Sequence, residues 1–187
     1  MVFDRAHSGG NSLRFYAAPY DGVSASKADL ELGGLQFQKG NDVWFSGWFF
    51  LEEGPDSKGL FLWDLEETQG WNSPGRRIYL SGGEALTSDL GKWWGGEVFR
   101  QPVDHTVPFP KGAWVELVLH LYLSEGEDGL LEAWQDGALV LSGRGQTLPT
   151  KESIYDRMQV GITANGNEGQ AQVLIVDDIV LSREPLR

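Results

Sequence analysis

The ten residues from Trp114 to Leu123, WVELVLHLYL, decide the fold class. Apolar side chains occupy every second position, at 115, 117, 119, 121 and 123, and the positions between them are more polar or amphipathic. Successive side chains of a β-strand point to opposite faces, whereas a helix repeats every 3.6 residues. The stretch therefore predicts a β-strand with one buried face.

Short segments of the same kind occur along the rest of the chain, separated by Gly, Pro, Asp and Asn. Between Leu130–Gln135 and Ala138–Leu141 stands Asp136-Gly137, a dipeptide that favours a tight hairpin turn because both residues tolerate positive φ. Val43–Leu51 is apolar on both faces, which predicts a central strand covered on both sides. The further expected strands are 12–16, 26–32, 60–65, 77–81, 158–163 and 173–181. Together they predict one all-β domain over residues 1–187, a two-sheet antiparallel sandwich of the jelly-roll kind.

Two stretches are expected to be loops, 66–75 and 82–110. They carry Trp71, Trp93 and Trp94, and Trp63 stands beside the first of them. An indole on a loop rim can stack on the apolar face of a sugar, so these residues are candidate ligand contacts. Trp44, Trp48, Trp114 and Trp134 lie inside expected strands and are mostly assigned to packing.

The composition excludes some classes of function. The net charge of −12 disfavours nucleic acid and anionic membranes as partners, because phosphate contacts require Lys and Arg. With no cysteine, disulfides and thiolate metal sites are excluded. No apolar run is long enough to cross a bilayer, and the N-terminus lacks the apolar segment of a signal peptide.

Alternation also places polar side chains on common strand faces. Lys27, Asp29 and Glu31 share one side of their strand, as do Arg77 and Tyr79, and as do Arg157, Gln159 and Thr163. If these strands are neighbours, they form a polar surface suited to sugar hydroxyls, which need both donors and acceptors. The competing interpretation is an ordinary solvated sheet face with ion pairs of little energetic value.

Tyr79 and His120 are weak candidates for proton transfer. His120 shares a strand face with Glu116, but residues four apart on a strand are about 13 Å apart, so Glu116 cannot orient the imidazole. A structural histidine is therefore favoured over a catalytic one.

The order of segments resembles the concanavalin-A-like jelly rolls, and within them polysaccharide lyases of the alginate, glucuronan and heparin lyase I type. The resemblance rests on GNSLRF at 10–15, GNDVWFSGW at 40–48, KGAW at 111–114, DGLLEAWQDG at 128–137 and VDDIVLS at 176–182. It implies a polysaccharide or oligosaccharide ligand on a concave sheet and an extracellular or periplasmic location.

The resemblance also implies an Arg-x-Glu strand, a Gln-x-His pair and a strand rich in Tyr and Lys, which together perform β-elimination. Here Lys27 and Asp29 stand at the first motif and Leu62-Trp63-Asp64 at the second. Gln159 and Thr163 replace the usual Lys and Tyr. Asp64 therefore joins the expected ligand-binding residues, while the acid and base of a lyase are not evident.

No cofactor is expected to be required. Asp177 and Asp178 resemble the oxygen ligands with which jelly rolls hold a structural Ca²⁺, and a bulge or turn at a strand edge is the competing interpretation. Three functions remain open: a carbohydrate-binding domain, a polysaccharide lyase acting on a uronate-containing glycan, and a structural module that docks a protein.

Overall fold

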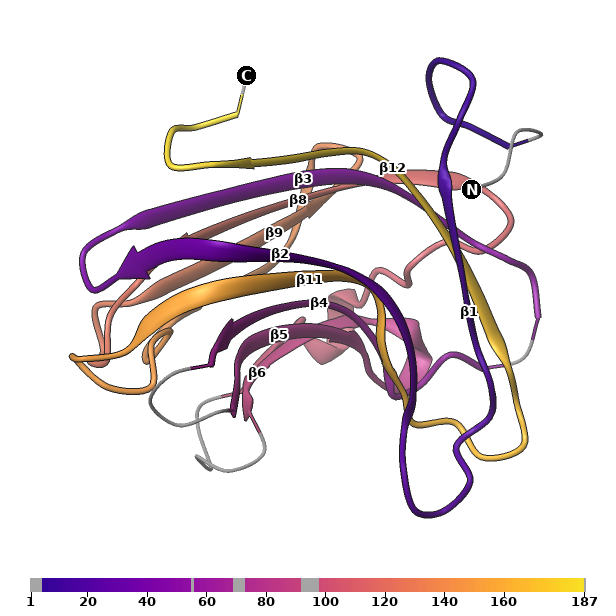
Figure 1. Ribbon diagram of the computed structural model, residues 1–187, viewed down its shortest axis with the longest axis horizontal. Helices are drawn as coiled ribbons and strands as arrows, with labels where there is room; N and C mark the ends of the chain where they lie inside the picture. Colours follow the sequence, from indigo (N-terminus) through magenta and orange to yellow (C-terminus); the bar gives the residue numbers. More distant parts are fainter. Residues whose placement is uncertain (1–4, 55, 69–72, 92–97, 187) are drawn as a thin grey trace.

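The computed structural model describes residues 5–54, 56–68, 73–91 and 98–186. Over these residues the chain forms two antiparallel six-stranded sheets packed face to face, which confirms the predicted sandwich (Figure 1). In the first sheet the strand order is β1 (Leu13–Ala17), β12 (Gln172–Ser182), β3 (Asp42–Leu51), β8 (Trp114–Tyr122), β9 (Leu130–Gln135), β10 (Ala138–Arg144). In the second it is β2 (Ser26–Gln38), β11 (Ile154–Asn165), β4 (Leu60–Glu67), β5 (Ser73–Leu80), β6 (Leu86–Leu90), β7 (Phe99–Arg100).

The core lies between the two sheets and follows the alternation of the strands. In β8, Val115, Leu117, Leu119 and Leu121 are fully buried, while the residues between them are half-buried on the outer face. At about 25 cal/mol per Å² of apolar surface, each such side chain contributes about 1.5–3 kcal/mol. The predicted hairpin also forms, since Asp136 has φ 48° and Gly137 φ 78°.

Strand β3 differs from its prediction. It is central, between β12 and β8, but only its inner face packs against the second sheet. Val43, Phe45 and Phe49 are buried in the core, whereas Trp44 and Trp48 lie half-buried on the outer face of the sheet. The prediction failed because the outer face of β3 is apolar in composition, although no second sheet packs against it.

Strand β2 is an edge strand, and its apolar side is less covered than alternation predicts. Leu30 and Leu32 are 43% and 44% exposed. β2 has a hydrogen-bonded neighbour only in β11, so its inward side chains lie at the margin of the sandwich, where the facing sheet covers less of them.

The segment 82–110 is not one loop. It contains β6, β7 and two short 3₁₀ turns, at Gly82–Glu84 and Val103–His105. β6 pairs with β5, so the strand extends the second sheet. Its sequence, LTSDL, is too short and too polar to show alternation, which is why it was not predicted.

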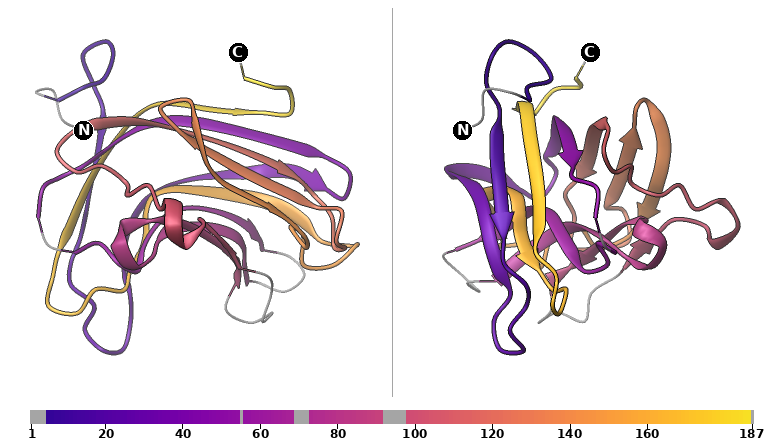
Figure 2. Two further views of the ribbon diagram at one scale, coloured as in Figure 1. Left: turned by 180° about the vertical axis from the view of Figure 1, so that it is seen from behind. Right: turned by 90° about the vertical axis from the view of Figure 1, so that its right-hand side faces the viewer.

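The second sheet curves, and its outer face is the hollow one (Figures 1 and 2). We call this outer face, formed by β2, β11, β4, β5 and β6, the concave face.

Candidate functional site

A row of polar side chains crosses the concave face. On five consecutive strands the residues directly opposite one another are Glu31, Gln159, Asp64, Arg77 and Asp89. We call these five residues the polar row. Directly opposed residues share a sheet face, and neighbouring strands are about 4.8 Å apart, so the row is about 19 Å long.

The polar row is anchored on both sides by ion pairs. Arg77 donates two hydrogen bonds of 2.8 Å, from Nε and a terminal nitrogen, to the two carboxylate oxygens of Asp89. Arg157 pairs with Glu31 at 2.9 Å and with the buried Glu66 at 2.5 Å. Both guanidinium groups are thereby balanced by carboxylates, and their side chains are held in place.

Asp64 lies at the centre of the row and is 4% exposed. Thr163 Oγ1 donates a hydrogen bond of 3.1 Å to Asp64 Oδ1. Burial penalises the charged carboxylate and raises the pKa of Asp64 to about 7, against the opposing effect of Arg77. A carboxyl group whose pKa is near neutrality can both donate and accept a proton, which is the property of a general acid or base.

An aromatic pair flanks the row. The rings of Phe61 and Tyr79 stack with centroids 4.7 Å apart, and the Arg77 guanidinium lies 4.6 Å from the centroid of Phe61. Burial, followed by the charge of Asp89, raises the pKa of the Tyr79 phenol, so it stays a hydrogen-bond donor at neutral pH.

Lys27 and Asp29 complete the concave face on β2. Burial raises the pKa of the Asp29 carboxyl, with Lys27 acting in the opposite direction. Within the described part of the chain Lys27 forms no ion pair, in contrast to Arg77 and Arg157.

The structure thus brings most of the predicted ligand-binding residues onto one face of one sheet. They are Lys27, Asp29, Glu31, Asp64, Arg77, Tyr79, Arg157, Gln159 and Thr163. Trp71, Trp93 and Trp94 lie outside the described residues.

Sequence reasoning missed Phe61, Glu66 and Asp89. Phe61 stood in the expected strand 60–65 without being named as a candidate, and the other two stood in expected loops. Trp63, expected beside a loop rim, is instead fully buried in the core against Phe45, at 5.7 Å between ring centroids. Bulges in β4 on either side of Trp63 turn both Leu62 and Trp63 inward.

His120 belongs to the other sheet. It lies on the outer face of β8, between Asp42 at 2.8 Å and Glu132 at 3.2 Å, and its ring stacks on Trp44. The two catalytic candidates, His120 and Tyr79, therefore cannot serve one site.

The expected calcium ligands, Asp177 and Asp178, instead hold the N-terminal segment. Their four carboxylate oxygens accept hydrogen bonds from the backbone of His7, Ser8 and Asp178 and from the side chains of His7 and Ser8. Asp178 has φ 50°, and the pairing of β12 with β3 shifts register here, as expected of a bulge.

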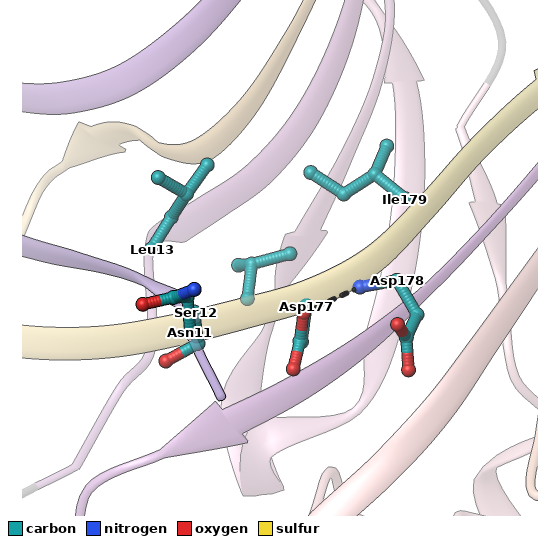
Figure 3. Close-up of a pocket in the computed structure, with 7 residues that line it drawn as sticks. Asn11, Ser12, Leu13, Asp177, Asp178 and Ile179 are labelled. Atoms are coloured by element: carbon teal, nitrogen blue, oxygen red, sulfur yellow. Dashed lines mark hydrogen bonds between the residues drawn. The ribbon is translucent and has the colours of Figure 1, made fainter. Parts of the chain in front are cut away.

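The same two residues line an open, largely apolar cavity of about 230 Å³ beside Leu13 and Ile179 (Figure 3). Among the described residues no group of three or more His, Cys, Asp or Glu side chains is placed to hold a metal ion. The carboxylates of Asp177 and Asp178 are engaged by hydrogen bonds from the chain itself, and a calcium site stays a prediction.

Comparison with known proteins agrees with this architecture. The profile of a family described as polysaccharide lyase matches residues 2–179. The chain belongs to this polysaccharide lyase family. Among curated protein sequences, none matches the chain.

Solved structures share the fold of this family member at low identity. An endo-β-1,4-glucuronan lyase from the fungus Trichoderma reesei superposes with a TM-score of 0.76 at 17% identity, over 98% of this chain and 85% of that one. A cellulose induced protein gives 0.72 at 19% identity, over 97% and 84%. An alginate lyase from Chlorella virus gives 0.61 at 13%, over 98% and 88%. Within the described residues, no helix is long and apolar enough to span a membrane.

Proposed function

We propose that the concave face binds a polysaccharide, with the polar row as its floor. The observation that carries this proposal is the direct opposition of five polar side chains across five strands. The row offers carboxylates as acceptors, one guanidinium group as donor and an amide that is both, which matches the mixed character of sugar hydroxyls.

The Phe61–Tyr79 stack supports the proposal, because it places half-buried aromatic rings beside the polar floor. A pyranose has an apolar C–H face that packs on such rings while its hydroxyls reach polar groups. The names of the similar lyase structures, which refer to glucuronan and alginate, also support a polysaccharide ligand.

The charges indicate how the ligand is held. Arg77 and Arg157 are already paired with carboxylates of the chain. We therefore expect the concave face to contact mostly hydroxyl groups of the polysaccharide rather than its carboxylates. If the polysaccharide contains uronate, Lys27 is the residue expected to meet its carboxylate, since it forms no ion pair within the described residues. An extracellular or periplasmic location stays part of this proposal.

The test is affinity electrophoresis with polyglucuronate, alginate and a soluble neutral β-glucan, followed by calorimetry with the polysaccharide that binds. Gln159→Ala and Tyr79→Ala are each expected to weaken binding about five- to twentyfold, equivalent to about 1–2 kcal/mol of lost contacts. For Lys27→Ala the matched control is Lys151→Ala. Lys151 is an exposed lysine in the segment between β10 and β11, outside the strands of the concave face. Unchanged binding in all three concave-face variants would refute the proposal.

Asp64 favours a second candidate, cleavage by β-elimination. With its pKa at about 7, this carboxyl group is suited to remove the proton on the carbon next to a uronate carboxylate. The electrons of that C–H bond then form a C=C bond and expel the glycosidic oxygen, which must take up a proton. We assign that proton to Tyr79, which is protonated at neutral pH and stands two residues after Arg77 on the neighbouring strand.

Ultraviolet absorbance of the unsaturated product distinguishes cleavage from binding alone. If the chain is a lyase, absorbance grows with a uronate polysaccharide, and Asp64→Asn abolishes the growth while leaving binding within about threefold of the wild type. Binding of a uronate polysaccharide by the wild type with no rise in absorbance would exclude this second candidate and leave the first intact.

A further inference from the structure

A second surface, on the opposite side of the molecule, carries half of the chain's eight tryptophans. Trp44 and Trp48 of β3, Trp114 of β8 and Trp134 of β9 all lie half-buried on the outer face of the first sheet. We call these four residues the tryptophan face. The core accounts for none of them, since the side chains that fill it belong to the alternate positions of the same strands.

Three rings on this face share one orientation. The rings of Trp44 and His120 stack at 4.0 Å with planes 10° apart, and Trp44 and Trp134 are 6.1 Å apart with planes 16° apart. His120 is fixed by its hydrogen bonds to Asp42 and Glu132. The indoles are therefore held in place before any ligand arrives, which reduces the entropy lost on binding.

The charged residues of the strands that carry the tryptophan face have a single sign, while one basic residue, Arg5, lies at the end of the face over Phe50, beside Trp114. Strands β3, β8 and β9 contain no Lys or Arg, and their charged residues are Asp42, Glu116 and Glu132. The Asp42 side chain is 46% exposed and that of Glu132 25%. Such a surface repels a polyanion but offers acceptors to hydroxyl groups.

The chain itself shows that an indole of this face takes a stacking partner. The imidazole of His7, from the N-terminal segment, lies flat on Trp48 at 3.7 Å between centroids with planes 9° apart. Among the described residues, the N-terminal segment places no ring on Trp44 or Trp134. At this end His120 covers one side of the Trp44 ring, and the described N-terminal residues cover neither indole.

From these observations we infer that the tryptophan face binds a neutral polysaccharide, and the β-1,4 linkage in the name of the similar glucuronan lyase makes cellulose-type chains the ligand we propose. The C–H faces of its sugar rings pack on the surface of Trp44 and Trp134 that His120 leaves uncovered, and its hydroxyls donate hydrogen bonds to Asp42 and Glu132. The site lies on the opposite outer face from the polar row, so one molecule holds two glycan chains independently.

The test compares retention on microcrystalline cellulose and the dissociation constant for cellohexaose. Trp44→Ala and Trp134→Ala are each expected to weaken binding about two- to tenfold, and the double variant to abolish retention. Gln159→Ala, which alters only the concave face, is the matched control and is expected to retain wild-type binding. Circular dichroism and the thermal midpoint establish that each variant is folded, and Trp134→Phe, which keeps a ring, is expected to lose less than Trp134→Ala.

Four outcomes overturn the inference. The first is that the wild-type protein binds neither cellulose nor cellohexaose. This outcome overturns the inference whether or not sedimentation shows that the tryptophan face joins two copies of the chain. The second is a folded double variant with unchanged retention. The third is displacement from cellulose by saturating polyglucuronate, which would mean that the two ligands share one site. The fourth is loss of cellulose binding in Gln159→Ala but not in the tryptophan variants, which would assign the neutral glycan to the concave face. Failure of this inference is therefore distinguishable from failure of the proposed function.

Discussion

The two outer faces of this sandwich use their side chains in opposite ways. The concave face places charged and amide groups in a continuous row, tied together by ion pairs from Arg77 and Arg157. The tryptophan face places indoles over three strands, whose charged residues are carboxylates beside a single histidine, His120. Both faces stand on strands whose inner sides contribute to the same core.

This difference shows that an apolar residue in a strand can belong to either side of a sheet. Burial separates the five tryptophans that the structure describes into one core residue, Trp63, and four half-buried surface residues, and chain position does not. The contrast can be tested by removing members of each group and by altering the one buried carboxyl of the polar row.

The largest expected effect comes from Trp63→Ala. Trp63 is fully buried between the sheets, so its truncation leaves a cavity and is expected to lower the free energy of unfolding by about 3–5 kcal/mol. Trp44→Ala removes the same atoms from the half-buried outer face and is expected to cost about 1 kcal/mol. Urea unfolding monitored by circular dichroism measures both. Equal losses in the two variants would mean that the tryptophan face is as buried as the core.

The fold was predictable because alternation in β8 and β9 and the Asp136-Gly137 turn depend on neighbouring residues alone. The side on which an alternating set faces depends on the second layer, which the sequence of one strand does not contain. For this reason Trp44 and Trp48 were assigned to packing and Trp63 to a rim. Bulges in β4, which turn Trp63 inward, also leave no signal in the order of residues.

A second prediction concerns pH. Because the folded protein raises the pKa of Asp64 from 3.8 to about 7, between these values the folded state holds a proton that the unfolded state has lost. Stability contributed by this group therefore falls as the pH rises, at up to about 1.4 kcal/mol per pH unit.

Asp64→Asn removes this dependence and keeps an oxygen for Thr163. The variant is expected to gain stability relative to the wild type as the pH rises from about 4.5 to 6.5. Urea unfolding at several pH values measures the difference, with Asp104→Asn in an exposed turn as the control. A constant difference across this range would show that Asp64 is ionised throughout and is not suited to proton transfer.

The concave site was predictable in composition but not in register. Alternation placed Lys27, Asp29 and Glu31 on one face, and likewise Arg77 with Tyr79, without stating which residue of one strand opposes which of another. Asp89 and Glu66, which neutralise Arg77 and Arg157, stood in expected loops, so the arginines seemed free to meet a ligand carboxylate. The raised pKa of Asp64 follows from burial, which only the assembled sheet provides.

The smallest effect is expected at the end of the tryptophan face that the chain itself covers. His7→Ala removes the ring stacked on Trp48 and the hydrogen bond from the side chain to Asp178, for a cost of about 1 kcal/mol. The matched control is His105→Ala, because His105 is 80% exposed and pairs only with its neighbour Asp104 among the described residues. Thermal unfolding measures the stability, and acrylamide quenching of tryptophan fluorescence measures the uncovering of Trp48. Greater quenching with little loss of stability would mean that the N-terminal segment covers an aromatic surface that does not depend on it. Unchanged quenching would contradict the stack of His7 on Trp48, and the chain would then offer no example of a ring stacked on this face by the N-terminal segment.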